Sequence, residues 1–344
     1  MSTITLAIDC MGGDFGPPVS VAASKKALEN HPNLCLKLFG DEAIIEPLLQ
    51  SFSPELKSRI SVFHTTEVVE MDDKPSVALR NKKASSMRKA IEAVRDDQAE
   101  ACVSAGNTGA LMALSRFVLK MIPGIDRPAI ITAIPTAKGH TYMLDLGANV
   151  DCDSETLFQF GIMGSVLNSA IDQIEQPKVG LLNIGEEEIK GNDQLKQAAQ
   201  LLSESPHINY IGFVEGNDIF MGECDVVVTD GFTGNNVLKA SEGAVRLLAQ
   251  KLKAVFEKNL LFKLIGLMIR PILKSFKDDI DPDKYNGATL VGLKGIVIKS
   301  HGGASVEATV NAIEEAIAEV EHNIPERIAQ EVEQIVNSRT QPNV

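Results

Sequence analysis

Two stretches decide the fold: ACVSAGNTGA at residues 101–110 and DVVVTDGFTGN at 225–235. Each begins with a short apolar run of the length of a buried strand and continues into G-x-T-G, at 106–109 and 231–234. A segment of helical period follows both. A strand that ends in glycine before a helix is typical of parallel sheets, so the chain is predicted to be an α/β protein.

The rest of the chain repeats this alternation. Further strands are predicted at 5–10, 36–40, 60–64, 142–147, 179–185 and 295–302, all as buried strands. Helices are predicted at 19–29, 85–96, 193–203, 236–256 and 305–321. The 344 residues exceed the ~250–300 at which one core stops growing. We therefore expect one α/β unit of two interwoven lobes over 1–338, and a frayed tail at 339–344.

Composition excludes several classes of protein. The net charge of −13 and the absence of Trp argue against nucleic-acid binding. The first residues lack the basic start of a signal peptide, and the apolar run Leu260–Leu273 is interrupted by Lys263, Arg270 and Pro271. Five scattered cysteines form no CxxC pair, so neither a zinc site nor a disulfide framework is indicated. A cytoplasmic protein is expected, with peripheral membrane contact through Leu260–Leu273 left open.

A basic and apolar segment at 251–277 differs from the rest of the chain. It carries seven Lys or Arg residues and one acid, Glu257, and large apolar residues lie between them. Two interpretations remain open. It forms either a helical hairpin packed on the protein, or an exposed protrusion that docks on an acidic partner or an anionic membrane.

The glycine turns are the candidate ligand sites, because ligands of open α/β sheets bind beyond the carboxyl ends of strands. Glycine permits close approach, and a helix N-terminus favours an anion. A third glycine turn, HGGAS, follows the strand at 295–302. The alternative is that these are capping turns without ligands. The candidate residues of the three turns are Asn107, Thr108, Gly109, Asp230, Thr233, Gly234, Asn235, His301 and Gly302.

Two further loops contain charged candidates. In NIGEEEIKGND (183–193), Lys190 beside Gly191 and Asn192 suits an anionic substrate or a developing oxyanion; a solvated loop is the alternative. In DCMGGD (9–14), Asp9 and Asp14 either bind metal or fix the loop through backbone N–H groups, and we favour the second. Phosphate-loop, GxGxxG, HExxH and GxSxG motifs are absent, which removes support for nucleotide hydrolysis, a dinucleotide-linked dehydrogenase and serine-type acyl transfer.

Taken together in order, the motifs resemble one family. They are D-x-MGGD (9–14), R-x-KK-x-SSM (80–87), SAGNTGALM (104–112), GIDRPA (124–129), LDLGANVD (144–151), MGS (163–165), GLLNIGEEEIKGN (180–192), DVVVTDGFTGN (225–235), YNGATLVGLKG (285–295) and IKSHG (298–302). The chain resembles the bacterial phosphate acyltransferase family known as PlsX over nearly its whole length. Cys10 departs from the usual Ala, which disfavours Cys10 as a nucleophile.

The resemblance implies a reaction, a fold and partners. The reaction is acyl-[acyl-carrier protein] plus phosphate giving acyl phosphate and free carrier protein, before a membrane glycerol-phosphate acyltransferase in phospholipid synthesis. The fold is an α/β/α sandwich similar to isocitrate and isopropylmalate dehydrogenases and phosphotransacetylase, with a helical protrusion, as a homodimer without metal or organic cofactor. Carrier protein is acidic, so the candidate docking residues are Lys258, Lys263, Arg270, Lys274 and Lys277.

The hypothesis for the mechanism is direct attack of phosphate on the thioester, with Lys190 as the charged group and the glycine turns holding phosphate. Two other functions stay open. One is a phosphotransacetylase-like enzyme that uses acyl-CoA, and the other is a non-catalytic scaffold that recruits carrier protein to the membrane.

Overall fold

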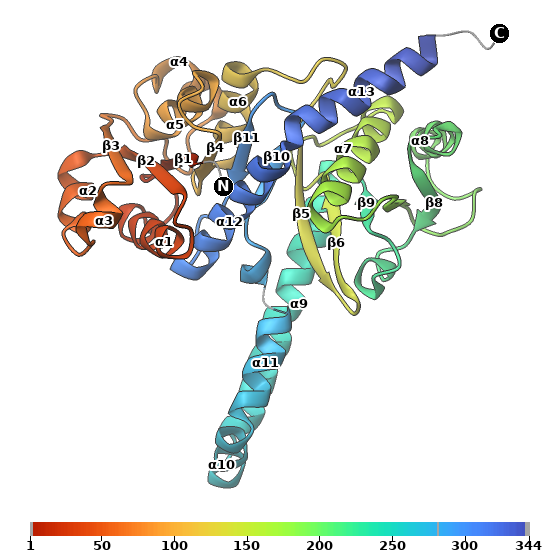
Figure 1. Cartoon of the computed structure of the whole chain (residues 1–344). Coiled ribbons are helices and arrows are strands. Elements are labelled where there is room, and N and C mark those ends of the chain that lie inside the picture. Colours follow the sequence, from red (N-terminus) through yellow and green to blue (C-terminus); the bar gives the residue numbers. More distant parts are fainter. Residues whose placement is uncertain (1–2, 281, 341–344) are drawn as a thin grey trace.

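The computed structural model describes residues 3–280 and 282–340, and their strands form one sheet in the order β3-β2-β1-β4-β11-β10-β5-β6-β9-β7-β8 (Figure 1). The strands are β1 (Ile4–Asp9), β2 (Leu34–Gly40), β3 (Ile60–His64), β4 (Ala101–Ser104), β5 (Ala129–Thr136), β6 (Gly139–Leu144), β7 (Lys178–Leu182), β8 (Asn209–Val214), β9 (Val226–Val228), β10 (Ala288–Val291) and β11 (Ile296–Lys299). Helices cover both faces of this sheet, which confirms the predicted α/β class.

The helices match the predicted positions closely. They are α1 (Pro17–Asn30), α2 (Glu42–Leu49), α3 (Pro54–Lys57), α4 (Pro75–Asn81), α5 (Ser86–Arg95), α6 (Thr108–Leu119), α7 (Ser154–Asp172), α8 (Asp193–Glu204), α9 (Gly231–Glu257), α10 (Leu260–Met268), α11 (Arg270–Ile280), α12 (Val306–His322) and α13 (Ile324–Thr340). Helix α9 begins at Gly231, five residues before the predicted start, because Asp230 caps it. Helix α13 continues to Thr340, and the remaining tail residues 341–344 lie outside the described residues.

The sheet consists of two parallel halves joined by an antiparallel centre. In the first lobe β3, β2, β1, β4 and β11 run parallel, and in the second lobe β6, β9, β7 and β8 run parallel. Between them, β10 pairs antiparallel with both β11 and β5, and β5 pairs antiparallel with β6. Strands β5, β8 and β10 were not among the predicted ones. Strand β3 was expected to be buried and is instead an edge strand with exposed side chains.

The chain connects the lobes more than once. After building the second lobe it returns through β10 and β11 to the middle of the sheet. Helix α12 then packs against α1 of the first lobe, and α13 packs against α7 of the second. One buried cluster accordingly joins β1, β2, β4, β11 and α12, and another joins β6, β7, β9, α7 and α13.

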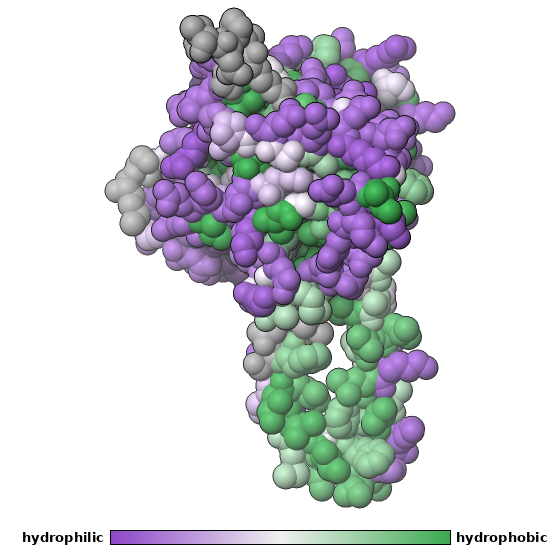
Figure 2. Space-filling view, turned by 90° about the vertical axis from the view of Figure 1, so that its right-hand side faces the viewer, coloured by the Kyte–Doolittle hydropathy of each residue, from purple (hydrophilic) through white to green (hydrophobic). Residues whose placement is uncertain are grey.

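Helices α9, α10 and α11 form a long protrusion that extends away from the body (Figure 1). Gly266 of α10 lies against the ring of Phe256 near the end of α9; a Cβ atom there would be 3.1 Å from the ring. No residue of α10 is buried, and the protrusion presents a mostly apolar surface below a mostly polar body (Figure 2). Within the described residues, no helix combines the length and the apolar character needed to cross a bilayer.

Candidate functional site

Three neighbouring strand ends of the first lobe meet at Asp9. The carboxylate of this buried residue at the end of β1 accepts hydrogen bonds from the Ser104 hydroxyl (2.6 Å) and the Met11 N–H (3.3 Å). Burial raises the pKa of Asp9 above its usual value, although these hydrogen bonds oppose the shift. Asp9 therefore fixes the loop after β1, as expected. Among the described residues, no group of three His, Cys, Asp or Glu side chains is placed to hold a metal.

Asn107 lies at the N-terminus of α6, where its side chain is fully used by the protein. Its Oδ1 accepts from the Ala110 N–H (3.0 Å), and its Nδ2 donates to three carbonyls of the 70–73 loop, including Met71 O (2.8 Å) and Asp73 O (2.9 Å). Asn107 is thus a helix cap that also holds the neighbouring loop. Thr108 and Gly109 follow it as the first residues of α6.

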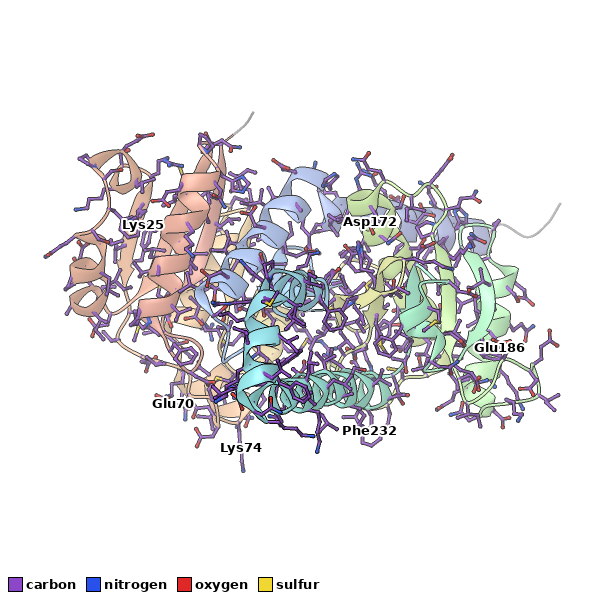
Figure 3. All side chains as sticks on the ribbon, turned by 90° about the horizontal axis from the view of Figure 1, so that it is seen from below. Lys25, Glu70, Lys74, Asp172, Glu186 and Phe232 are labelled. Atoms are coloured by element: carbon purple, nitrogen blue, oxygen red, sulfur yellow. The ribbon has the colours of Figure 1, made fainter. Side chains whose placement is uncertain are left out.

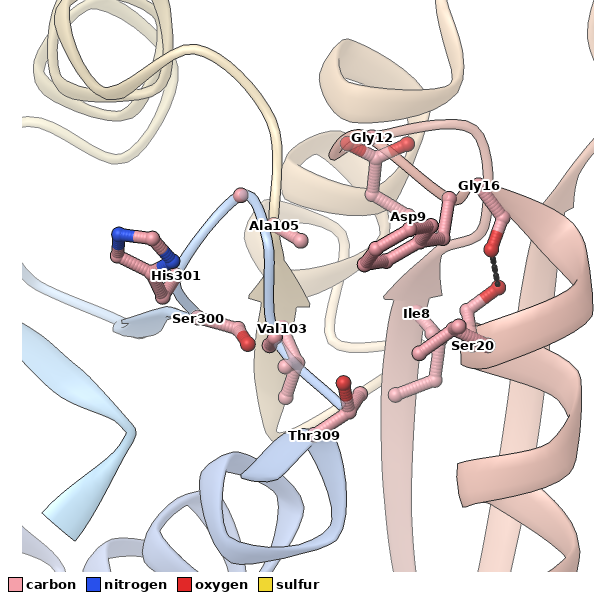
Figure 4. A pocket seen from close by; sticks show the side chains of 14 residues that line it. Ile8, Asp9, Gly12, Gly16, Ser20, Val103, Ala105, Ser300, His301 and Thr309 are labelled. Atoms are coloured by element: carbon pink, nitrogen blue, oxygen red, sulfur yellow. Dashed lines mark hydrogen bonds between the residues drawn. The ribbon is translucent and has the colours of Figure 1, made fainter. Parts of the chain in front are cut away.

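His301 and Gly302 continue from β11 and lie beside the same turn. Asp14 N–H donates to Gly302 O (2.8 Å), and His301 N–H donates to Asn286 Oδ1 (2.8 Å). Figure 4 shows a pocket between these strand ends, with Asp9, Ala105, Ser300 and His301 around it. The structure therefore brings Asn107–Gly109 and His301–Gly302 together at one edge of the first lobe.

The second lobe has a corresponding site at Asp145, which follows β6. Its Oδ1 accepts from the N–H groups of Ile130 (3.0 Å), Gly147 (3.2 Å) and Ala148 (3.0 Å). Its Oδ2 accepts from both the N–H (2.6 Å) and the side-chain amide (2.9 Å) of Asn149. Burial raises the pKa of this carboxyl against these bonds. Asp145 had not been predicted as a functional residue.

The turn predicted at 230–235 lies against Asp145 and the loop that follows it. Asp230 caps α9 by accepting from Thr233 N–H (2.8 Å) and Thr233 Oγ1 (2.9 Å), so these two polar side chains hold each other. Gly234 lies so close to Asp145 that a Cβ atom would be 2.0 Å from its carbonyl oxygen. Asn235 packs on Gly147, where an added Cβ atom would be 3.5 Å from the Cβ of Asn235.

Lys190 lies on the outer side of the second lobe. Its side chain is exposed and its Nζ is 4.0 Å from Glu187 Oε1. In Figure 3, Glu186 of the same loop lies far from Glu70 and Lys74, which mark the first-lobe turn. The structure therefore does not bring the Lys190 loop to the first-lobe turns. The loop follows β7, which is paired with β9, the strand that leads into the second-lobe turn.

Asn183, at the start of the Lys190 loop, is a buried side chain that sequence reasoning passed over. Neither its Oδ1 nor its Nδ2 has a hydrogen-bond partner among the described residues. It lies under Gly191, where a Cβ atom would be 2.6 Å from Asn183 Oδ1. Gly191 also has a positive φ of 82°, which favours glycine at this position. Asn192 caps α8 by accepting from Leu195 N–H (2.9 Å).

The two strand-end sites belong to opposite sides of the junction between the lobes. Met112 of α6 and Val237 and Leu238 of α9 pack against the same buried cluster. Lys239 of α9 is close enough to Lys299 of β11 for its charge to lower the pKa of Lys299. Helices α6 and α9, which carry most of the predicted contacts, therefore both border the interlobe junction.

The predicted docking residues lie on the protrusion. Lys258, Lys263, Arg270 and Lys274 are exposed there. Lys277 belongs to α11, but its side chain lies outside the described residues. These positions are remote in the fold from the strand ends at which the polar site residues gather (Figure 1).

Lys299 is the main residue that sequence reasoning missed. It ends the apolar run of β11 and is buried, with 8% of its surface exposed. The available signal was its position: a lysine that directly continues a buried strand, two residues before His301.

Comparison with known proteins is consistent with this architecture. Residues 4–327 match the model of a family described as fatty acid synthesis protein. A phosphate acyltransferase of Methylococcus capsulatus is 55% identical over 335 residues, covering 97% of this chain and 98% of that protein. A phosphate acyltransferase of Hydrogenovibrio crunogenus is 55% identical over 336 residues, covering 98% and 99%.

Solved structures share the fold at low identity. A phosphotransacetylase from Streptococcus pyogenes has a TM-score of 0.61 at 16% identity, covering 93% of this chain and 94% of that chain. The EutD phosphotransacetylase from Staphylococcus aureus has a TM-score of 0.57 at 17% identity, covering 92% and 94%. The predicted resemblance is confirmed: this chain belongs to the fatty acid synthesis protein family, the PlsX family of its motifs, and is an enzyme of the transferase class.

Proposed function

We propose that this enzyme transfers an acyl group from the thioester of acyl carrier protein to inorganic phosphate. Family membership over nearly the full chain carries the proposal. The glycine-rich turn at the start of α6 supports it because it offers a helix N-terminus to an anion. The product is an acyl phosphate, and phospholipid synthesis is the process that would consume it.

The chemistry is a direct displacement. A phosphate oxygen attacks the thioester carbonyl carbon, the carbon–sulfur bond breaks, and the sulfur leaves as a thiolate that takes up a proton. Cysteine is the obvious alternative nucleophile, but Cys10, Cys102, Cys152 and Cys224 are all buried. Burial raises the pKa of Cys10 to about 12 and also raises that of Cys102, so neither thiol supplies a thiolate near neutral pH.

Lys190 is proposed to stabilise the charge that develops on the carbonyl oxygen. Its loop lies away from the first-lobe turns in this structure, so this role requires the loop to approach them when substrate is bound. It is exposed and only 4.0 Å from Glu187, so it can leave this weak pair for a substrate. Lys190→Ala should lower kcat with acyl-carrier protein by roughly 100-fold or more. Lys196→Ala, on the surface of α8, is the control. Near-normal production of acyl phosphate by Lys190→Ala would refute this role.

The basic residues of the protrusion are proposed to dock carrier protein. Lys258, Lys263, Arg270 and Lys274 are exposed, and none of the four has an acidic partner within the described chain. Lys253, in contrast, is paired with Glu257 at 3.8 Å. Free cations attract an acidic protein despite the net charge of −13.

The apolar residues of the same protrusion favour a second role, peripheral contact with a membrane. Leu260 is 87% exposed and Met268 is 75% exposed, on a helix with no buried residue. An amphipathic surface that combines such residues with lysines suits an anionic lipid interface. We also propose that the enzyme acts as a homodimer in the cytoplasm, as the resemblance implies.

The deciding experiment compares two acyl donors. The full-length enzyme is given inorganic phosphate with either acyl-carrier protein or acyl-CoA of the same chain length, and acyl phosphate is trapped with hydroxylamine. We expect kcat/KM to be at least about tenfold higher with carrier protein. Equal or better use of acyl-CoA would support a phosphotransacetylase-like activity instead, and no acyl phosphate with either donor would leave only the scaffold role.

The docking surface has its own test. Charge reversal in Lys263→Glu/Arg270→Glu should raise KM for acyl-carrier protein several-fold and leave KM for phosphate unchanged. Lys57→Glu, on α3 of the first lobe, is the matched control. An unchanged KM for carrier protein would place the docking site elsewhere.

A further inference from the structure

Lys299 is a buried cation without a countercharge in contact. Its side chain extends from the last position of β11 to the same side of the sheet as Val297, which packs in the cluster below α5 and α6. Its Nζ donates hydrogen bonds to the carbonyl oxygens of Ala105 (3.3 Å) and Ser300. Ala105 and Ser300 belong to the strand ends drawn in Figure 4.

Carbonyl oxygens alone compensate a buried ammonium group poorly. No carboxylate of the described residues lies within 4.0 Å of Lys299 Nζ. Among the residues whose burial the structure describes, it is the one buried Lys or Arg. Buried charges in proteins are normally paired. The carboxylates of Asp9 and Asp14 act on Lys299 only from beyond contact distance, so its ammonium group lacks an anion in direct contact.

Charged groups of both signs act on Lys299 from beyond contact distance. Burial is the main cause that lowers its pKa, to about 8, and the Lys239 ammonium lowers it further. Asp9 and Asp14 oppose the shift, and His301 lies two residues away on the same loop. Lys239 comes from α9 of the second lobe, where its Nζ is also paired with Glu242 at 3.1 Å.

The turn above Lys299 adds hydrogen-bond donors. Ala105 lies three residues before Thr108, at the start of α6. The Asn107 side chain and carbonyl accept from Ala110 and Leu111, which leaves the N–H groups of Thr108 and Gly109 without a partner in the described chain. N–H groups at a helix N-terminus and an ammonium group are both donors from which phosphate oxygens accept hydrogen bonds.

We propose that Lys299 binds the phosphate group at the interlobe junction beside the start of α6. The proposal rests on the proposed function for the identity of the ligand as the phosphate substrate. The same chemistry would also fit the phosphodiester of the carrier's pantetheine arm. We assign the site to inorganic phosphate, because a small anion fits a position where only 8% of the Lys299 surface is exposed.

The test measures phosphate binding directly. The full-length protein is titrated calorimetrically with inorganic phosphate without an acyl donor, as wild type, Lys299→Met, Lys299→Arg, Lys239→Met and Lys57→Met. We expect Kd to rise about tenfold or more in Lys299→Met, a few-fold in Lys239→Met and less than about twofold in the exposed control Lys57→Met.

The pH dependence separates binding from a purely structural role. Wild-type affinity should fall as the pH rises through about 8, because the ammonium group loses its proton. Lys299→Arg should keep its affinity over the same range, because the guanidinium stays charged. If Lys299→Met does not fold, Lys299→Arg still decides: a fall in affinity identical to that of the wild type would overturn the proposal.

Steady-state kinetics separate the two sources of the phosphate group. Raised KM for phosphate with unchanged KM for acyl-carrier protein in Lys299→Arg or Lys299→Met supports the assignment. Unchanged Kd for phosphate together with raised KM for the carrier would overturn it in favour of the pantetheine arm. A wild-type enzyme that binds phosphate through Lys299 but forms no acyl phosphate would refute the proposed function and leave this site standing.

Discussion

The two lobes finish their central strands in similar ways but place different charges there. In the first lobe Asp9 ends β1 beside the turn that starts α6, and in the second lobe Asp145 follows β6 beside the turn that starts α9. Both aspartates are buried and accept hydrogen bonds from the loop that follows them. Both helices carry a polar N-cap, Asn107 or Asp230.

The difference between the lobes lies in what surrounds each carboxylate. Near Asp9 lie the buried Lys299 and two helix N–H groups without a partner in the described chain. Around Asp145 the described residues include no buried cation, and five hydrogen bonds hold the carboxylate. The two turns thus share a design and differ in charge: the buried cation and the two N–H groups of the first lobe favour the proposed anion site there, whereas the second-lobe turn is a rigid base for α9 and its protrusion.

The largest predicted effect contrasts one glycine of each turn. In Gly234→Ala the new Cβ would be 2.0 Å from the Asp145 carbonyl oxygen, whereas in Gly109→Ala it would be 3.2 Å from the end of the Pro75 ring. We expect Gly234→Ala to lose roughly 3–5 kcal/mol of unfolding free energy and Gly109→Ala less than about 1 kcal/mol. Urea unfolding measures both. Equal losses would contradict a tighter second-lobe turn.

The next prediction follows from the pKa of Lys299. The unfolded lysine binds its proton up to about pH 10.5, and the folded one only up to about 8. Between these values the unfolded chain holds more protons, so the unfolding free energy of the wild type should rise with pH. In phosphate-free buffer, the unfolding free energy of the wild type should rise over this pH range by roughly 3 kcal/mol relative to that of Lys299→Met.

A control from the second lobe makes this measurement specific. Lys138 is an exposed lysine whose Nζ is 3.5 Å from Glu223, so its contribution is that of a surface group. The difference in unfolding free energy between wild type and Lys138→Met is measured over the same pH range, and the corresponding difference for Lys299→Met should change more. If the difference in unfolding free energy between wild type and Lys299→Met does not change with pH, burial does not lower the pKa of Lys299.

A smaller contrast comes from the two aspartates. In Asp145→Asn an NH2 group would face the two donors of Asn149 or the row of backbone N–H groups, so a hydrogen bond is lost at a buried site. In Asp9→Asn the Ser104 hydroxyl can turn and accept instead. We expect losses of about 2 kcal/mol and less than about 1 kcal/mol, respectively, in thermal or urea unfolding. The reverse order would show that Asp9 is the more constrained residue.

Much of the fold could be predicted because local signals agreed with it. Ser85 and Ser305 mark helix starts at which their hydroxyls do cap α5 and α12. Strand β10 was missed because it is short and pairs antiparallel at the centre of the sheet, a position that no local pattern encodes. Helix α9 starts early because Asp230 caps it, although its first turn contains two glycines that normally disfavour a helix.

The site was harder to predict because its residues gain their roles from distant partners. Asn107 looks like a ligand in SAGNTG, but its amide holds the 70–73 loop, far away in sequence. Lys299 looks like the exposed end of a strand, and only the fold places Ala105 over it. Charge and burial at a strand end depend on which strands become neighbours, and that information is not local.

The smallest effect on stability is expected on α10, at the end of the protrusion that α9 begins. Leu264→Ser/Leu267→Ser should change the unfolding free energy by less than about 0.5 kcal/mol, because both side chains are already more than half exposed. Sedimentation with liposomes that contain anionic lipid should nevertheless show reduced binding. Ile44→Ser on α2, also exposed, is the control that should not alter binding. Unchanged liposome binding by the double variant would exclude the membrane role. The apolar surface of the protrusion would then be assigned to contact with a protein partner. A large loss of stability would instead mean that these leucines are covered in solution, as in a contact between two copies of the chain.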